Sequence, residues 1–337
     1  MSSQLRASGR WLTRSGIQFP SGGVARYYRA DLQLNRKIST EITGYTVSAL
    51  VLAYRQTAEA EFLDGAVRAA HFLTREAWDA ESGVMPFEIE PAERAYFFDC
   101  GIIVRGLLAL WRVTKECELV DAAQAIARSM ANDFLRADGS AWPVLHLPDK
   151  TPLPLDATRW SLSTGCYHLK SAAAWRELAA ITGDSSWVEC YARALESALR
   201  GHESFLPGST DPHHMMDRLH PYLYFLEGLL AHPEHDAIVR AGAGRVNALY
   251  SELASHFERG DVAAQLLRVQ CAIQAGKADC DAMAARVREF QLPNGGYYFG
   301  RKGGAWIPHV SPVPAVFAMQ ALEWYERPES IDRATVI

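Results

Sequence analysis

Two kinds of helical segment alternate along this chain, and their alternation limits the possible folds more than any other feature. The first kind carries a single apolar stripe: in residues 60–75, Phe62, Ala66, Ala69 and Leu73 recur at spacings of three and four. Such a stripe is typical of a helix with one face in solvent. The same pattern is found in residues 3–14, 118–134 and 186–199.

The second kind of segment is apolar nearly all round. Residues 99–114, for example, contain Ile102, Ile103, Leu107 and Leu108 on several faces, and this predicts a helix that is buried on all sides. Six such helices are expected, starting near Ser39, Phe98, Ser163, Leu219, Asp261 and Ser311. Two of these starts read as a capping residue followed by proline at the first helical position, namely Ser311-Pro312 and His220-Pro221.

Six buried helices that alternate with six amphipathic ones predict an all-α fold, a closed (α/α)6 toroid of the six-hairpin glycosidase kind. The buried helices would form an inner barrel and the amphipathic helices an outer shell. A solenoid is the alternative, but it needs polar capping repeats, and the terminal segments here are no more polar than the others. Because the repeat runs from end to end without a linker, we expect one domain over residues 1–337.

Composition excludes several classes of function. The net charge is −5 and there is no Lys/Arg-rich run, so we expect no nucleic-acid partner. No apolar stretch approaches the roughly 18–20 residues that cross a bilayer, which predicts no transmembrane segment. The chain begins without an apolar leader, and its six cysteines form no C-x-x-C pair. A cytoplasmic protein with reduced core thiols is therefore expected.

Neither a metal nor another cofactor is expected. The adjacent His213 and His214 suggest metal binding at first sight, but neighbouring residues do not share one helix face, as the histidines of zinc sites on helices do.

Three segments carry a resemblance to known proteins: residues 40–45 (TEITGY), 98–101 (FDCG) and 217–220 (DRLH). With them the chain resembles the six-hairpin (α/α)6-toroid proteins, which include glycoside hydrolases, uronate lyases and sugar epimerases. It is most similar to a bacterial group among polysaccharide genes that is described as glucuronyl C5-epimerase-like or prenyltransferase-repeat-like. That group usually has Thr where this chain has Cys100. The resemblance covers nearly the whole chain and implies a carbohydrate-active protein without specifying its reaction.

A toroid of this kind would gather polar residues at one mouth, because parallel inner helices open their N-termini on the same face. The candidate catalytic residues are Asp99, Glu41, His220, Tyr45 and His309. The candidate substrate-binding residues are Arg218, Asp217, Tyr222, His168 and Tyr96, together with Trp306, Tyr297 and Trp142, whose rings could stack on sugars. The fifth inner helix offers only Asp261 and Gln265.

The helix N-termini also lead to an electrostatic prediction. Several of them aimed at one cavity give a partially positive floor that suits an anionic group. The same field would lower the pKa of Asp99 and Glu41, so that both stay ionised. An acidic or highly hydroxylated saccharide is the expected ligand.

Three carbohydrate reactions stay open. Hydrolysis would use Asp99 and Glu41, about 5–5.5 Å apart for retention or roughly 6.5–9.5 Å for inversion. A uronate lyase or epimerase would instead use Tyr45, His220 or His309 as a base, with Arg218 holding the carboxylate. Uronate chemistry is slightly favoured, since His and Tyr outnumber the acid pairs.

Two alternatives lie outside this chemistry. One is a non-catalytic saccharide-binding protein of polysaccharide assembly. The other is a toroid of the terpenoid-cyclase or prenyltransferase kind, against which the absence of a D-x-D-D run counts. The oligomeric state, the sugar and the linkage are left open by the sequence.

Overall fold

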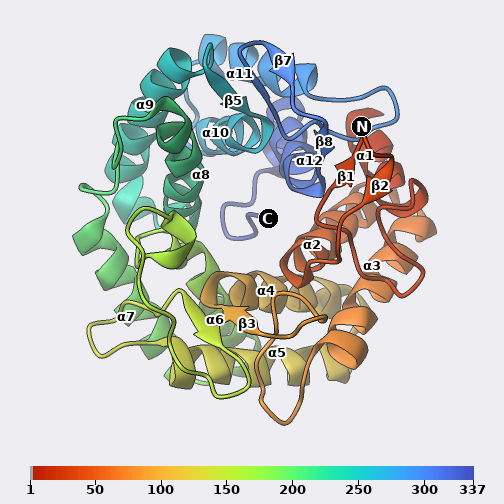
Figure 1. Ribbon diagram of the computed structural model, residues 1–337, viewed down its shortest axis with the longest axis vertical. Coiled ribbons are helices and arrows are strands. Elements are labelled where there is room, and N and C mark those ends of the chain that lie inside the picture. Colours follow the sequence, from red (N-terminus) through yellow and green to blue (C-terminus); the bar gives the residue numbers. More distant parts are fainter. Residues whose placement is uncertain (1–2) are drawn as a thin grey trace.

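The computed structural model describes residues 3–337, which form a double ring of helices (Figure 1). Twelve α-helices lie in this described part of the chain. The inner barrel consists of α2 (Thr40–Thr57), α4 (Phe97–Thr114), α6 (His168–Thr182), α8 (Pro212–Leu229), α10 (Gly260–Ala272) and α12 (Pro312–Glu326). The outer shell consists of α1 (Ser3–Arg14), α3 (Ala60–Phe72), α5 (Cys117–Ser129), α7 (Ser186–Gly201), α9 (Asp236–Leu253) and α11 (Lys277–Glu289).

The ring is closed. Each inner helix packs against the next, and the last inner helix, α12, packs on both α2 and α1. Figure 1 shows the first and last helices side by side. The (α/α)6 toroid is therefore confirmed, and the solenoid alternative is wrong because it would leave these two ends apart.

Serine caps begin two of the inner helices where the sequence predicts them. The Ser39 hydroxyl accepts a hydrogen bond from Ile42 N (3.5 Å) at the start of α2. The Ser311 hydroxyl accepts one from Val313 N (3.4 Å) at the start of α12. Such caps satisfy backbone donors that the first helical turn leaves without partners.

Two predicted helix starts are wrong. Helix α8 begins at Pro212 rather than near Leu219, because Asp211 caps it by accepting from His214 N (2.9 Å) and Pro212 occupies the first turn. Pro221 therefore lies inside the helix instead of starting it. Helix α6 begins at His168, so this histidine opens the helix rather than lying one turn within it.

Two glycines bring α2 and α4 into backbone contact. A Cβ atom on Gly106 would lie 2.5 Å from the Gly44 carbonyl oxygen, and one on Gly44 would lie 2.9 Å from Ile103 Cα. Since neither obstacle is a flexible side chain, a larger residue at these positions forces the two helices apart.

We expect Gly106→Ala to lower the free energy of unfolding by about 1–3 kcal/mol, the usual cost of overpacking. Gly244→Ala in outer helix α9 is the matched control, because nothing lies within 4 Å of its added Cβ. That change should instead add up to about 1 kcal/mol through helix propensity. Urea unfolding of the two variants measures the difference, and equal effects would contradict the close approach.

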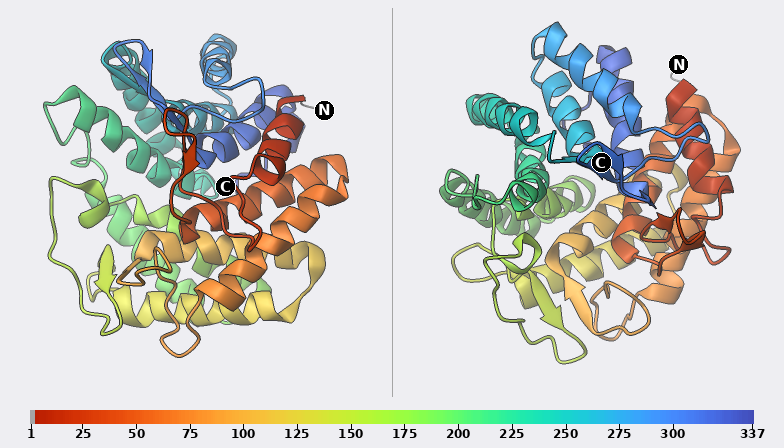
Figure 2. Two further views of the ribbon diagram at one scale, coloured as in Figure 1. Left: turned by 45° about the vertical axis from the view of Figure 1, so that its right-hand side comes forward. Right: turned by 45° about the horizontal axis from the view of Figure 1, so that its top comes forward.

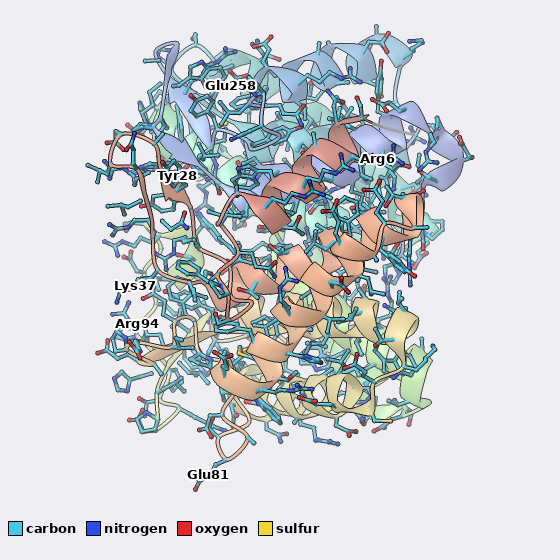
Figure 3. All side chains as sticks on the ribbon, turned by 90° about the vertical axis from the view of Figure 1, so that its right-hand side faces the viewer. Arg6, Tyr28, Lys37, Glu81, Arg94 and Glu258 are labelled. Atoms are coloured by element: carbon cyan, nitrogen blue, oxygen red, sulfur yellow. The ribbon has the colours of Figure 1, made fainter. Side chains whose placement is uncertain are left out.

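Short antiparallel sheets cover one end of the barrel (Figures 2 and 3). The three sheets have the strand orders β2-β1-β8, β3-β4 and β5-β6-β7. The strands are β1 (Tyr28–Arg29), β2 (Leu34–Asn35), β3 (Arg94–Tyr96), β4 (Val144–His146), β5 (Phe257–Arg259), β6 (Gly300–Lys302), β7 (Ala305–Trp306) and β8 (His309–Val310). Because β3, β5 and β8 directly precede inner helices, this end carries the N-termini of the barrel. In Figure 3, Tyr28 and Arg94 mark this face.

The last residues of the chain close the opposite end of the barrel, and Figure 1 shows them near the centre of the ring. Gln320 of α12 binds them twice: its Nε2 donates to Thr335 O (2.9 Å) and its Oε1 accepts from Ile337 N (2.9 Å). Arg105 of α4 donates to Val336 O (2.6 Å). The toroid therefore opens at its strand-bearing end.

The cysteines form no disulfide within the part of the chain that the structure describes. Four of the six are buried, Cys190 is half-buried and Cys117 is exposed. None of the helices within residues 3–337 is long and apolar enough to cross a membrane.

Candidate active site

A cleft with two lobes lies at the N-terminal ends of the inner helices. The lobes share Glu41 and Trp160. The acidic lobe, about 520 Å³ in volume, is lined by polar and aromatic residues that include Glu41, Asp99, Tyr96, His168, Phe98 and Tyr167. The histidine lobe, about 750 Å³, is lined by residues that include His220, His309, Arg26, Arg259, Asp261 and Tyr224.

The first turns of the inner helices place most of these groups. Glu41, Asp99 and Asp261 lie in the first turns of α2, α4 and α10. His168 is the first residue of α6, whereas His220 lies well inside α8 because that helix starts early. Residues far apart in sequence therefore meet at one mouth, as the alternation of helices predicts.

The two carboxyl groups of the acidic lobe hold protons more strongly than usual. Burial raises the pKa of Glu41 to about 7, against the charges of Arg26 and Lys170. Burial and the neighbouring charge of Glu41 raise the pKa of Asp99 well above its ordinary range. Asp99 Oδ2 is buried and meets no hydrogen-bond donor among residues 3–337.

The prediction that the helix N-termini keep both acids ionised is therefore wrong. Loss of hydration outweighs the field of the helix ends for these two groups. Near neutral pH Glu41 exists in both forms, and the raised pKa of Asp99 favours its protonated form. Such a pair can act as general acid and base without a metal ion between them.

The raised pKa of Glu41 should change how the free energy of unfolding depends on pH. A carboxyl whose folded pKa lies above its ordinary value of 4.5 stabilises the fold only while it is protonated. That contribution is present below pH 4.5 and is lost as the pH rises through about 7. The wild type should therefore lose free energy of unfolding as Glu41 ionises between about pH 5 and about pH 8, whereas Glu41→Gln, which does not titrate, should not. The stability of the variant relative to the wild type is expected to rise over this range. Urea unfolding of both proteins across this range checks the sign, and a constant difference would contradict it.

His220 is held in one neutral tautomer. Its Nδ1 lies 2.6 Å from Gln265 Oε1. The Gln265 amide nitrogen is directed elsewhere, toward Glu227 Oε2 (3.3 Å) and His220 O (3.4 Å), so its oxygen must face the imidazole. Nδ1 therefore carries the proton and donates it to Gln265. Nε2 keeps its lone pair and makes no hydrogen bond within the described residues, on a side chain that lines the histidine lobe.

Burial keeps the His220 imidazole neutral. Burial lowers the pKa of His220 to about 4, against the opposing effect of Asp261, whose Oδ2 lies 3.6 Å from Nδ1. Asp261 is already bound by Arg259 through two hydrogen bonds of 3.0 and 2.6 Å. Because Arg259 neutralises that carboxylate, Asp261 does not draw a second proton onto the imidazole. His220 is thus a free base at neutral pH.

Two further histidines face the cleft. His309 of β8 stacks on Tyr27 with 4.4 Å between ring centroids, and burial with the nearby Arg29 lowers its pKa. His168 lies in the acidic lobe, where burial lowers its pKa to about 3. Its Nε2 is buried and unpartnered within the described chain. The structure therefore brings Glu41, Asp99, Tyr96, His168, His220 and His309 together.

Two tyrosines from the sequence prediction lie away from this cleft. Tyr45 is buried and lines the cavity at the other end of the barrel. Burial raises its pKa well above 10, which disfavours the phenolate that a base would need. Tyr222 is buried against Phe205 and Phe225.

The predicted aromatic platform also lies outside the cleft. Trp306 is 38% exposed on β7 and stacks on Tyr298 with 4.9 Å between centroids. Tyr297 is buried, and the Arg136 guanidinium covers the ring of Trp142 at 4.6 Å. The aromatic side chain that both lobes do share is Trp160, which the sequence did not single out.

Asp217 and Arg218 line a rim pocket next to the cleft and do not pair with each other. Asp217 accepts from Arg259 (2.9 Å), while Arg218 donates to Phe205 O (3.1 and 2.7 Å). The Arg218 guanidinium is therefore held by the backbone carbonyl of Phe205.

A fully buried ionic network lies below the cleft and was missed in the sequence. Glu227 of α8 accepts from Lys170 of α6 (2.6 Å) and from Arg268 of α10 (3.0 Å through Nε). Gln265 links this network to His220. The sequence contains an indication of this network, because charged residues at buried positions of a helix require partners.

No set of three or more His, Cys, Asp or Glu residues in the described range 3–337 is arranged to hold a metal ion.

Comparisons with known proteins bear on the fold. No protein-family model matches the chain, and a comparison with curated proteins also finds no match. Among solved structures, a sugar epimerase from a ruminal bacterium is 13% identical, with a TM-score of 0.72 over 98% of this chain and 99% of that one. The cellobiose 2-epimerase from Bacillus thermoamylovorans B4167 is 12% identical, with a TM-score of 0.73 over 96% and 98% of the two chains. A D-mannose isomerase is 11% identical, with a TM-score of 0.69 over 97% and 98%. At these identities the likeness shows the fold: the chain is an (α/α)6 toroid.

Proposed function

We propose that this protein is a carbohydrate-active enzyme that epimerises or isomerises a sugar by proton transfer at a carbon next to a carbonyl group. The observation that carries the proposal is His220, a neutral imidazole whose tautomer is fixed and whose Nε2 lone pair faces an open lobe. A general base near neutral pH needs this protonation state.

The remaining groups of the cleft fit the same chemistry. His220 Nε2 takes the proton, and the electron pair of the broken C–H bond moves onto the carbonyl oxygen. Glu41 borders both lobes and is partly protonated near neutral pH, so it supplies a proton to that oxygen. In its protonated form His309, which lines the same lobe as His220, returns a proton to carbon, and Glu41 takes back the proton that it gave to the oxygen. Trp160 offers an aromatic face for a sugar ring.

The names of the similar structures agree with this choice. Sugar epimerase, cellobiose 2-epimerase and mannose isomerase all rearrange a sugar without splitting it from a polymer. The finer resemblance, to the glucuronyl C5-epimerase-like group, implies a uronate substrate whose carboxylate needs a cation. Arg26 already pairs with Glu88 (2.7 Å), and Arg259 with Asp217 and Asp261. A uronate would have to open one of these pairs.

Glycoside hydrolysis is the second candidate, favoured by the two carboxyl groups in the acidic lobe. The raised pKa of Asp99 favours its protonated form, so Asp99 would serve as the acid. Glu41, with a pKa of about 7, would serve as the base or nucleophile. This reaction would leave His220 without a role.

Proton NMR in D2O separates these functions. The purified protein is incubated with cellobiose, mannose and uronate oligosaccharides. We expect the proton next to the carbonyl carbon to exchange with deuterium while new anomeric signals of an epimer or isomer appear. New reducing ends would mean hydrolysis and an olefinic signal would mean elimination. Line broadening without new signals would mean a saccharide-binding protein, and each of these three results would overturn the proposal.

A further inference from the structure

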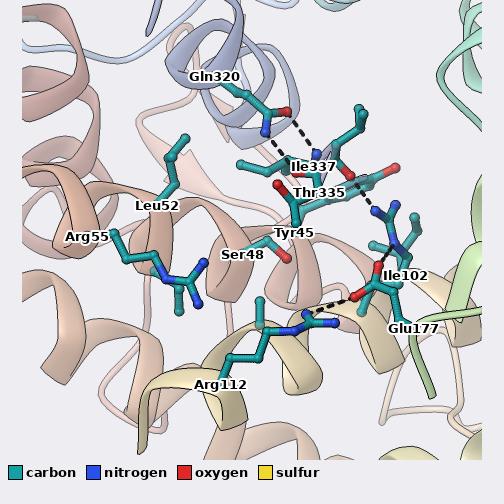
Figure 4. A pocket seen from close by; sticks show the side chains of 14 residues that line it. Tyr45, Ser48, Leu52, Arg55, Ile102, Arg112, Glu177, Gln320, Thr335 and Ile337 are labelled. Carbon is teal, nitrogen blue, oxygen red and sulfur yellow. Dashed lines mark hydrogen bonds and ion pairs between the residues drawn. The ribbon is translucent and has the colours of Figure 1, made fainter. Parts of the chain in front are cut away.

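A second cavity lies at the opposite end of the barrel from the cleft (Figure 4). Its walls come from the inner helices α2, α4, α6 and α12 and from the last residues of the chain. Three arginines, Arg55, Arg105 and Arg112, line it together with a single acidic side chain, Glu177. Figure 4 shows the guanidinium groups of Arg55 and Arg112 reaching into this space from neighbouring helices.

The arginines that line this cavity outnumber its acidic side chains. Glu177 accepts from both Arg105 (2.7 Å) and Arg112 (2.9 Å), so one carboxylate serves two guanidinium groups. Arg55 has no carboxylate within 4 Å in residues 3–337 and donates no side-chain hydrogen bond there. Burial and the charge of Arg112 lower the pKa of Arg55, while the charge of Asp332 acts in the opposite direction. Three guanidinium groups therefore share one acidic side chain in the wall of this cavity.

Helix dipoles do not account for these arginines. Cations are favoured at every helix C-terminus, so the dipole would place basic residues in the last turns of all the inner helices. Among the inner helices as described, only α2 and α4 carry one, Arg55 and Arg112 respectively. These two helices are the neighbours that flank the cavity.

We propose that this cavity binds a phosphate group, carried by inorganic phosphate or by a small phosphorylated metabolite. The planar guanidinium forks of Arg55 and Arg112 match the oxygens of a phosphate, and Ser48 adds a hydroxyl donor in the same wall. Arg105, held by Glu177 and by Val336 O, supplies positive charge at the floor. The site lies apart from the cleft, so its ligand is not a reactant in the proposed sugar chemistry.

Isothermal titration calorimetry with inorganic phosphate tests this site, and glucose 6-phosphate serves as a second probe. We expect the wild type to bind at least one of the two. Arg55→Gln should weaken this binding and raise the dissociation constant by roughly 10- to 100-fold. Arg112→Gln should have an effect of similar size. Tighter binding of the sugar phosphate would show that the rest of the cavity is used, and equal binding would assign the site to free phosphate.

Arg240→Gln on outer helix α9 is the matched control, since Arg240 is also exposed and makes no ion pair within residues 3–337. It should bind phosphate as the wild type does. The proposal is overturned if neither probe binds, or if Arg55→Gln and Arg240→Gln bind equally well. Because Arg55 holds no other side chain, its variant should fold, and thermal unfolding confirms this. Binding is measured without turnover, so the result does not depend on the proposed function.

Discussion

Replacing His220 by asparagine should lower the rate of sugar epimerisation or isomerisation by roughly 10²- to 10⁴-fold, the usual contribution of a positioned general base. Asparagine can still donate a hydrogen bond to Gln265 but has no basic nitrogen to present to the cleft. The rate is followed by NMR on a substrate that the wild type converts.

His256→Asn is the matched control for this prediction. His256 is exposed, and its side chain makes no hydrogen bond within residues 3–337. Its replacement should leave the rate unchanged. If the two variants turn over equally fast, His220 is not the base, and the carboxyl pair of the acidic lobe becomes the better candidate.

Removing the Glu227 side chain should have the largest effect on stability. Glu227→Ala leaves the charges of Lys170 and Arg268 buried without their shared carboxylate. Loss of one partner from a buried ionic network costs about 3–5 kcal/mol, which is a large part of the stability of an ordinary domain. Urea unfolding, or the yield of folded protein if the variant does not fold, measures this loss.

An exposed pair provides the comparison. Glu118→Ala removes the partner of Arg75 on the surface, where both side chains are about half exposed, and should cost about 0–1 kcal/mol. A similar loss in the two variants would mean that the buried network contributes no more than a surface pair. Glu227→Gln, which keeps the hydrogen-bonding shape but not the charge, should fall between them.

The fold could be predicted because it depends on periodicity alone. A helix with one apolar stripe and a helix apolar all round are distinguishable in the sequence, and their alternation defines a two-layer ring. The start of α8 was missed because two prolines, Pro212 and Pro221, each give a helix-start signal. The Asp211 cap, which accepts a hydrogen bond from His214 N, favours the earlier start at Pro212.

The candidate site could be predicted only in part. Parallel inner helices explain why Glu41, Asp99, His168 and His220 meet at one mouth. The direction of the pKa shifts of the two acids could not be predicted, because it depends on how deeply the loops and strands cover them. Arg26 and Trp160 lie in such connecting segments, which carry no periodic signal.

Charged residues within the buried helices were a signal that the sequence did contain. Lys170, Glu227 and Arg268 are buried charged residues of three neighbouring inner helices, and buried charges are stable only when they are paired. Gln265 connects this network to His220, so the same residues that stabilise the barrel also fix the tautomer of the proposed base.

Long-range proton–nitrogen NMR of the His220 imidazole tests the central claim most directly, because it requires no knowledge of the substrate. We expect a protonated Nδ1 and an unprotonated Nε2 from about pH 5 to about pH 8, since the pKa of this histidine is lowered to about 4. Comparison with His220→Asn assigns the signals. An imidazolium at neutral pH, or a proton on Nε2 in place of Nδ1, would contradict the assignment of His220 as the base that faces the cleft.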